Sequence, residues 1–120
     1  MKVSLFSALA VAALTAAPAY AANESVIYSF AGGQDGEYAD TDLVMDASGN
    51  LYGTSVEGGA HASGTVWKLS PNGNSWTHTV LYSFTGGTDG GEPYKGVTLD
   101  AQGNLYGTAV TGGGGGCGCG

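Results

Sequence analysis

The chain has 120 residues, a length that favours one domain at most, and its ten acidic residues against three basic ones give a formal net charge of −7. It contains no arginine, so we do not expect it to bind nucleic acid or an anionic membrane surface, which both depend on Lys and Arg. Glycine contributes 23 residues. Many of them stand in pairs beside Asp, which is typical of turns between short strands.

Residues 1–21 are predicted to be a cleaved secretory signal. Lys2 supplies a positive start, an apolar run follows over 3–17, and Ala19-Tyr20-Ala21 places small residues at the cleavage site. The alternative is a membrane anchor, but the run is shorter than the roughly 20 apolar residues that span a bilayer. We therefore expect a mature chain of residues 22–120, without a membrane span, secreted to the periplasm, the cell surface or the medium.

The remainder consists of one sequence unit that occurs twice. Residues 26–30 (VIYSF) return as 80–84 (VLYSF), and all equivalent positions lie 54 residues apart. Across 26–66 and 80–120, 20 of 41 positions are identical. The repeat region 22–120 therefore divides into unit one, residues 26–79, and a truncated unit two, residues 80–120.

Four short strands are predicted in unit one. Residues 43–46 form a short apolar run, and residues 50–56 and 64–70 alternate between two faces. The segment Pro71-Asn72-Gly73-Asn74 predicts a turn, after which residues 76–84 alternate again. No stretch after residue 22 has helical periodicity.

This content predicts an all-β, propeller-like fold with about two antiparallel four-stranded blade units, because 54 residues is close to the roughly 50 of kelch-type repeats. The runner-up is a small β-sandwich in which the two units pack face to face. Gly53 is expected on an innermost strand, where neighbouring backbones crowd together. Closed propellers have about four to eight blades, so this chain is expected to present open edges that pair with another chain.

Four phrases together resemble a known bacterial repeat: residues 80–84 (VLYSF), 86–90 (GGTDG), 103–108 (GNLYGT) and 64–71 (GTVWKLSP). Over residues 26–116 the chain resembles the GloVer tandem repeat of choice-of-anchor bacterial surface proteins. The resemblance implies an exported, propeller-like array, often followed by a C-terminal anchoring segment, with no assigned reaction and no catalytic residues. The chain departs from that pattern in having few repeats, no anchoring segment and the ending GCGCG at 116–120.

Alternating oxygen-bearing residues make two stretches weak candidates for a calcium site. Glu57 stands at the twelfth position of an EF-hand count, but Leu51 occupies the sixth, where that loop needs Gly. A hairpin turn, in which Asp accepts backbone N–H groups, is the favoured alternative. The candidate ligands are Asp46, Ser48 and Asn50 in unit one and Asp100 and Asn104 in unit two.

The other reactive side chains have ordinary explanations. Asp35 and Asp89 precede glycines in loops that could form an acidic mouth for a cation or a sugar hydroxyl, but turn formation is favoured. His61 and His78 have no further ligands at zinc spacing. Cys117 and Cys119 are too close in sequence to pair well with each other and are expected to pair elsewhere. The aromatic residues are expected in the core rather than as sugar platforms: Tyr28, Phe30, Tyr52, Trp67, Trp76, Tyr82, Phe84 and Tyr106.

No catalytic set and no cofactor motif is recognisable. The segment Gly53-Thr54-Ser55-Val56-Glu57 fails the serine-hydrolase pattern at its last position. The expected function is therefore a non-enzymatic exported module for binding or architecture at the cell surface, with an unknown extracellular ligand. The alternatives are a fragment of a secreted carbohydrate-active enzyme and a truncated product without independent function.

Overall fold

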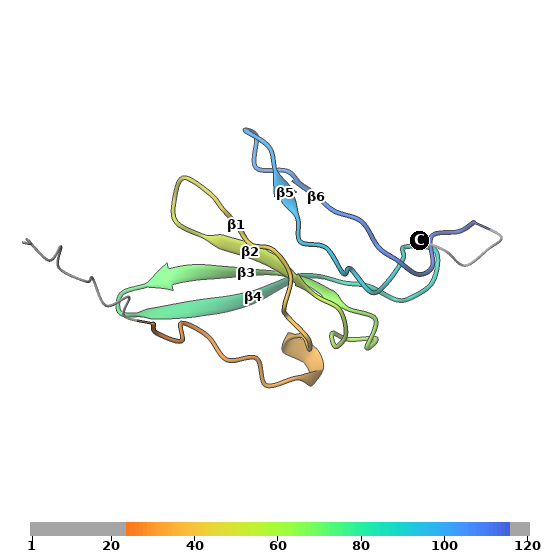
Figure 1. The fold of residues 1–120 in the computed structure, drawn as a ribbon, viewed down its shortest axis with the longest axis horizontal. Helices are drawn as coiled ribbons and strands as arrows, with labels where there is room; N and C mark the ends of the chain where they lie inside the picture. Colours follow the sequence, from red (N-terminus) through yellow and green to blue (C-terminus); the bar gives the residue numbers. More distant parts are fainter. Residues whose placement is uncertain (1–23, 116–120) are drawn as a thin grey trace, which may run out of the picture.

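The computed structural model describes residues 24–115 (Figure 1). The expected signal segment, Cys117 and Cys119 lie outside the described residues. Within them the chain is all-β, as expected, with antiparallel sheets and one short 3-10 turn, η1 (Gly33–Asp35). No helix in residues 24–115 is long and apolar enough to cross a membrane.

A four-stranded meander forms the main sheet, in the order β1 (Val44–Met45), β2 (Leu51–Ser55), β3 (Thr65–Asn72) and β4 (Ser75–Ser83). All neighbouring strands are antiparallel. Asn72 and Ser75 are paired, so Gly73 and Asn74 make a two-residue turn. Gly73 has φ 60°, and a positive φ at the first turn position favours glycine.

Alternation along β3 places the core on one face of this sheet. Thr65, Trp67 and Leu69 are at most 3% exposed, while the residues between them are partly exposed. The pairing shifts between Val66 and Trp67, which face Tyr82 and Val80, so Leu81 is an extra, bulged residue. The expected alternation in β3 is thus confirmed, whereas that of β4 changes at the bulge.

Unit two contributes a smaller sheet of two strands, β5 (Thr98–Leu99) and β6 (Leu105–Tyr106). These strands are equivalent to β1 and β2, and their hairpin stands beside that of β1 and β2 (Figure 1). The described residues form no closed ring of blades. The main sheet also crosses the boundary between the units, because residues 80–83 of unit two complete β4.

The loops of both units follow the same path. Glu37 forms an antiparallel bridge with Glu57, and the equivalent Gly91 forms one with Thr111. The amide of Gly59 donates to the carbonyl of Gly33 at 2.7 Å, and the equivalent pair in unit two is separated by 2.9 Å. The sequence repeat is therefore also a repeat of backbone hydrogen bonds.

The two units meet through close backbone contacts. The hydroxyl of Thr54, 1% exposed, lies 2.9 Å from the carbonyl oxygen of Pro93 and 3.0 Å from that of Lys95. Gly96 lies so close to the carbonyl of Asp42 that a Cβ atom would collide with it. These contacts fix the start of unit two against β2.

The glycine expected at the crowded inner edge has a different neighbour. Gly53 lies on β2, between β1 and β3, and a Cβ atom there would come within 2.6 Å of the ring of Trp67. The expectation that Gly53 approaches another backbone was therefore wrong, since it makes room for an indole. Gly96 has the close backbone contact instead.

Two of the expected core tyrosines are exposed. Tyr82 is 47% and Tyr106 58% exposed, whereas their unit-one equivalents Tyr28 and Tyr52 are partly covered. Tyr28 stacks on His78 of β4, with ring centroids 4.7 Å apart. Unit two has no described equivalent of β3 or β4, so no strand covers its tyrosines.

Candidate functional site

The candidate calcium ligands lie in two matching hairpin turns. Oδ1 of Asp46 accepts hydrogen bonds from the amides of Ser48 and Asn50, both at 2.9 Å. Its Oδ2 accepts from the side-chain amide of Asn50 at 2.7 Å and from the hydroxyl of Tyr52 at 3.0 Å. Both carboxylate oxygens are thus used within the turn, in the manner of an Asx turn.

Unit two repeats this turn bond for bond. Asp100 accepts from the amides of Gln102 and Asn104, from the side chain of Asn104 and from the hydroxyl of Tyr106, at 2.8–3.0 Å. The hydrogen bonds from the Asn side chains hold the pKa of Asp46 and of Asp100 below its ordinary value. Residues 24–115 contain no group of three or more His, Cys, Asp or Glu side chains arranged to hold a metal ion.

The two loop acids also serve local structure. Asp35 accepts from the amide of Ala31 at 2.9 Å and from the hydroxyl of Tyr28 at 3.0 Å. Asp89 accepts from the amide of Thr85 at 2.9 Å and from the hydroxyl of Tyr82 at 2.7 Å. Hydrogen bonds from Thr85 hold the pKa of Asp89 far below its usual range. Each acid therefore ties its loop to the preceding tyrosine, and Asp89 also lines a cavity of about 270 Å³ beside β6.

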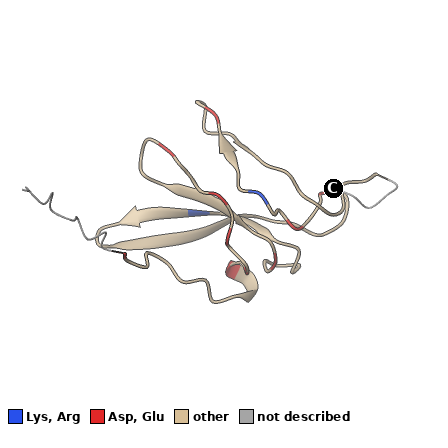
Figure 2. Ribbon diagram, viewed as in Figure 1, with Lys and Arg blue, Asp and Glu red and all other residues tan. Residues whose placement is uncertain are grey.

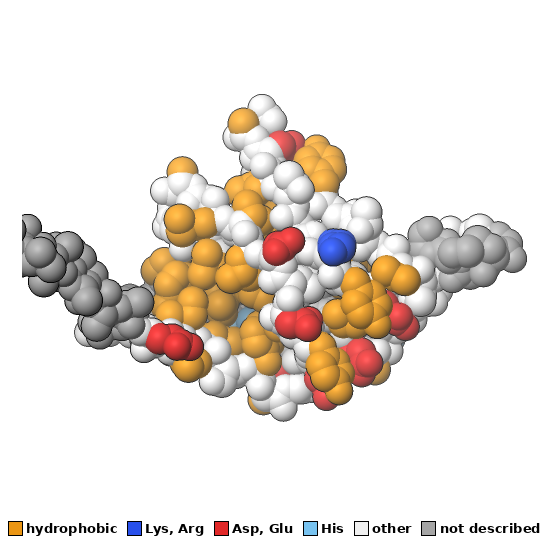
Figure 3. Space-filling view, viewed as in Figure 1, with side chains coloured by type: hydrophobic (Ala, Val, Ile, Leu, Met, Phe, Trp, Pro, Cys, Tyr) orange, Lys and Arg blue, Asp and Glu red, His pale blue; other side chains and the backbone are white. Residues whose placement is uncertain are grey.

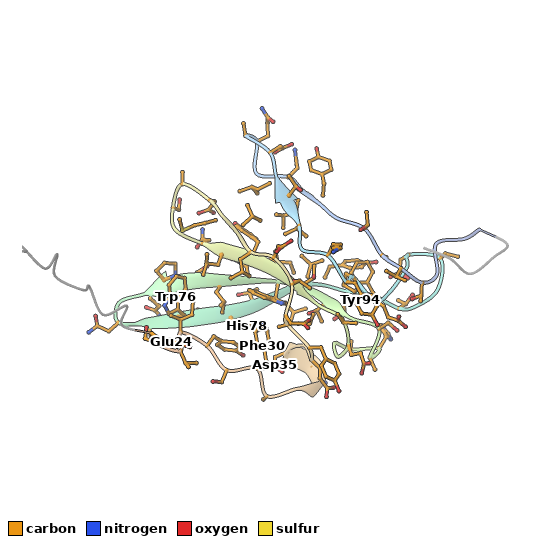
Figure 4. All side chains as sticks on the ribbon, viewed as in Figure 1. Glu24, Phe30, Asp35, Trp76, His78 and Tyr94 are labelled. Atoms are coloured by element: carbon orange, nitrogen blue, oxygen red, sulfur yellow. The ribbon has the colours of Figure 1, made fainter. Side chains whose placement is uncertain are left out.

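An aromatic cluster lies under the main sheet, where Figure 4 shows Phe30, Asp35 and His78 gathered below β4. The ring of Phe30 is 5.1 Å from that of Trp67 and 5.3 Å from that of His78. Burial lowers the pKa of His78, against the opposing effect of the Asp35 carboxylate. This cluster is core, as expected for Phe30 and Trp67, while His61 lies in an exposed loop.

A cleft at the junction of the units is the best candidate for ligand binding. It encloses about 270 Å³ and is lined by Tyr38, Asp40, Val56, Glu57 and Tyr94. Val56, 5% exposed, forms its floor, and Tyr38 and Tyr94 are 61% and 55% exposed. Figure 3 shows hydrophobic and acidic side chains interleaved on this part of the surface, where Figure 4 labels Tyr94. Exposed aromatic rings beside acids are available for contact with a ligand.

The charges around the cleft restrict what can enter it. All the acidic residues of the described chain lie outside the strands, in loops, turns and η1 (Figure 2). Asp40 and Glu57 line the cleft, and only Lys68 and Lys95 oppose the acids of residues 24–115. The cleft therefore disfavours anionic ligands and suits groups that donate hydrogen bonds.

Members of the Gloeobacter/Verrucomicrobia repeat family share this sequence pattern, and the family matches residues 14–119. The chain belongs to this family. No curated protein and no solved structure matches the chain at a significant level.

Membership of the repeat family explains the shared scaffold but not the cleft. The repeated residues build turns and core, whereas the cleft, apart from its floor at Val56, is lined at positions where the two units differ. Tyr38, Asp40 and Glu57 correspond to Glu92, Tyr94 and Thr111. Tyr38, Asp40 and Tyr94 do not repeat between the units and were not among the site residues expected from the sequence. The differences between the aligned units were the signal that could have identified them.

Proposed function

We propose that the chain is an exported, non-enzymatic repeat module that binds a surface glycan through the cleft of Tyr38, Asp40, Glu57 and Tyr94. The observation that supports it is the placement of two exposed tyrosines and two carboxylates around one cavity at positions that differ between the units. Tyrosine rings present an apolar face and a polar edge. Carboxylates accept the hydroxyl hydrogens of a sugar. A neutral or amino-substituted glycan fits this chemistry better than an acidic one.

The proposal also includes export, a location at the cell surface and a propeller-like array, which the resemblance to the GloVer repeat implies. Export by the 1–21 signal and a role at the cell surface are consistent with an acidic chain that lacks Arg. The blade-like main sheet and the repeated backbone of the second unit support a propeller-like array as the larger architecture. Surface anchoring of the choice-of-anchor kind belongs to the same proposal.

Titration calorimetry with neutral, amino-sugar and uronic-acid oligosaccharides tests the glycan proposal. We expect binding of a neutral or amino-sugar oligomer, at least about tenfold weaker in the Tyr38→Ala/Tyr94→Ala double variant, because truncating aromatic contacts at a binding site commonly costs more than 1.4 kcal/mol. Tyr106→Ala is the control, since Tyr106 is exposed but lies outside the cleft. Binding confined to uronic acids, or unchanged in the double variant, would contradict the proposal.

A second candidate, a fragment of a secreted carbohydrate-active enzyme, is favoured by one observation. Asp40 and Glu57 line the same cleft, and glycosidases use a pair of carboxylates across the bond that they cleave. Release of reducing sugar by the full chain that is lost in both Asp40→Asn and Glu57→Gln would establish this alternative. Binding without turnover supports the non-enzymatic module, and an unfolded chain by circular dichroism would support a product without independent function.

A further inference from the structure

The third strand of unit one completes its blade by placing an indole over a glycine. Trp67 of β3 pairs with Gly53 of β2 and is 2% exposed. Its ring lies 5.1 Å from that of Phe30 and fills the space next to the missing Cβ of Gly53. Leu43 lies beside the same glycine, its Cδ2 atom 3.0 Å from where a Cβ would stand.

The equivalent space in unit two is an open cavity. Fifty-four positions on, Phe30, Leu43 and Gly53 become Phe84, Val97 and Gly107. These three residues line a cavity of about 270 Å³ with Leu105 and Thr108. A Cβ atom on Gly107 would meet Val97 at 3.3 Å and no aromatic ring within 4 Å. The residues that receive Trp67 in unit one are therefore present in unit two, without an indole among them.

Within residues 24–115, the strand edge next to this cavity is also unpaired. β2 has five residues and pairs with β1 on one side and β3 on the other, whereas β6 has two and, in this described part of the chain, pairs with β5 alone. Gly53 and Thr54 are buried, but Gly107 and Thr108 are exposed. The open edge of β6 thus offers backbone groups to an added strand.

We infer that the free edge of β6 and the adjoining cavity bind an antiparallel strand of the β3 type, from a further copy of this repeat unit, with its tryptophan opposite Gly107. Unit one gives the register, because Leu51 pairs with Leu69, Tyr52 with Lys68 and Gly53 with Trp67. The incoming strand accordingly carries Leu, Lys and Trp opposite Leu105, Tyr106 and Gly107. The indole gives the binding of the strand its specificity. The hydrogen bonds between the two backbones set the antiparallel orientation of the incoming strand.

This site is separate from the proposed glycan cleft. None of the cleft residues Tyr38, Asp40, Val56, Glu57 and Tyr94 lines the cavity at Gly107. A test of strand binding at β6 can therefore give a negative result without affecting the proposal of glycan binding, and the reverse also holds.

A synthetic peptide with the sequence of residues 63–72, its tryptophan replaced by 5-fluorotryptophan, tests the inference with the full chain. We expect saturable binding, seen as a shifted fluorine resonance, and at least about tenfold weaker binding of the Trp67→Ala peptide measured by calorimetry, because a buried tryptophan is a typical hot spot. Absence of saturable binding, or equal binding of both peptides, would overturn the inference.

A variant of the protein tests the location of the site. Gly107→Leu fills the cavity and should abolish binding of the tryptophan peptide. Ala101→Leu introduces the same side chain at an exposed position in the β5–β6 turn and should leave binding unchanged. Binding that survives Gly107→Leu would place the peptide at the free edge of β1 or β4 and would contradict the assignment to β6. The Trp67→Ala peptide keeps the test decisive if Gly107→Leu does not fold.

Discussion

At the scale of single residues, identical amino acids in the two units have different surroundings. Gly53 is buried against Trp67, whereas the equivalent Gly107 is exposed. The sequence repeat predicts the conformation of such residues, because both follow the same local hydrogen bonds. It does not predict their burial, which depends on strands from other parts of the array.

The pair Gly53 and Gly107 gives a matched test of this difference. Gly53→Ala puts a methyl group 2.6 Å from the indole of Trp67 and should lower the free energy of unfolding by about 1–3 kcal/mol, as overpacking usually does. Gly107→Ala should change it by no more than about 0.5 kcal/mol, as is usual at the surface. Urea unfolding of both variants measures the difference, and equal effects would show that unit two is covered as unit one is.

His78 should make stability depend on pH near neutrality. Burial lowers its pKa in the folded state below the ordinary 6.5, while Asp35 partly opposes the shift; its other neighbours, Tyr28, Phe30 and Trp67, are aromatic. The unfolded chain then binds more protons just below pH 6.5, so stability is lost as the pH falls through this window. His78→Phe keeps an aromatic ring and should remove the loss between pH 7 and about 5.

Thermal unfolding of the wild type and His78→Phe across that pH range measures the effect. His61→Gln is the control, since His61 lies in an exposed loop. If His78→Phe loses stability on acidification as the wild type does, the partly buried His78 is not the cause.

At the scale of elements, the two Asx turns are the most regular feature of the fold. Asp, Gly, Asn and Tyr recur at fixed spacing, and each turn forms the same hydrogen bonds. Turn residues act locally, so the sequence could predict these hairpins. The strands β2 to β4 were predictable to within a few residues from alternation, and β1 from a short apolar run. The shortness of β5 and β6 was not, because strand length depends on a partner strand.

Removal of the turn carboxylates should show which of the two hairpins contributes more to the stability of the fold. Asp46→Ala should lower the melting temperature more than Asp100→Ala, since Asn50 and Tyr52 are partly buried in the main sheet whereas Asn104 and Tyr106 are exposed. Differential scanning calorimetry at neutral pH compares the two. A larger loss in Asp100→Ala would mean that the β5–β6 hairpin contributes more to stability than its exposure indicates.

At the scale of the whole molecule, the two units share strand β4 of the main sheet and are further joined by a few close contacts. Thr54 bonds to the chain at Pro93 and Lys95, and Gly96 lies against Asp42. The sequence could predict that two units are joined, but not this junction or the cleft beside it. Thr54 repeats as Thr108, but its partners Pro93 and Lys95 correspond to Ala39 and Thr41 in unit one, so the repeat does not reveal the contact.

Thr54→Val should loosen the junction without opening the main sheet. The substitution keeps the shape of the side chain but removes the hydroxyl and leaves the buried carbonyl of Pro93 without its donor, at a cost of about 1–3 kcal/mol. Limited proteolysis should then cut the 92–97 segment faster than the wild type, while β3 and β4 stay protected. Unchanged cleavage in this segment would show that the Thr54 hydroxyl does not secure the junction.

Hydrogen exchange on the full chain tests most directly the claim that unit one is a complete blade and unit two an open one. The amides of residues 51–55, which all pair with β3 and of which Leu51 and Tyr52 also pair with β1, should exchange slowly, and those of residues 105–109 should exchange much faster. Addition of the peptide of residues 63–72 should slow exchange at 105–109 alone. Equal protection of the two segments in the chain by itself would contradict the account, because it would mean that the edge of β6 is already paired.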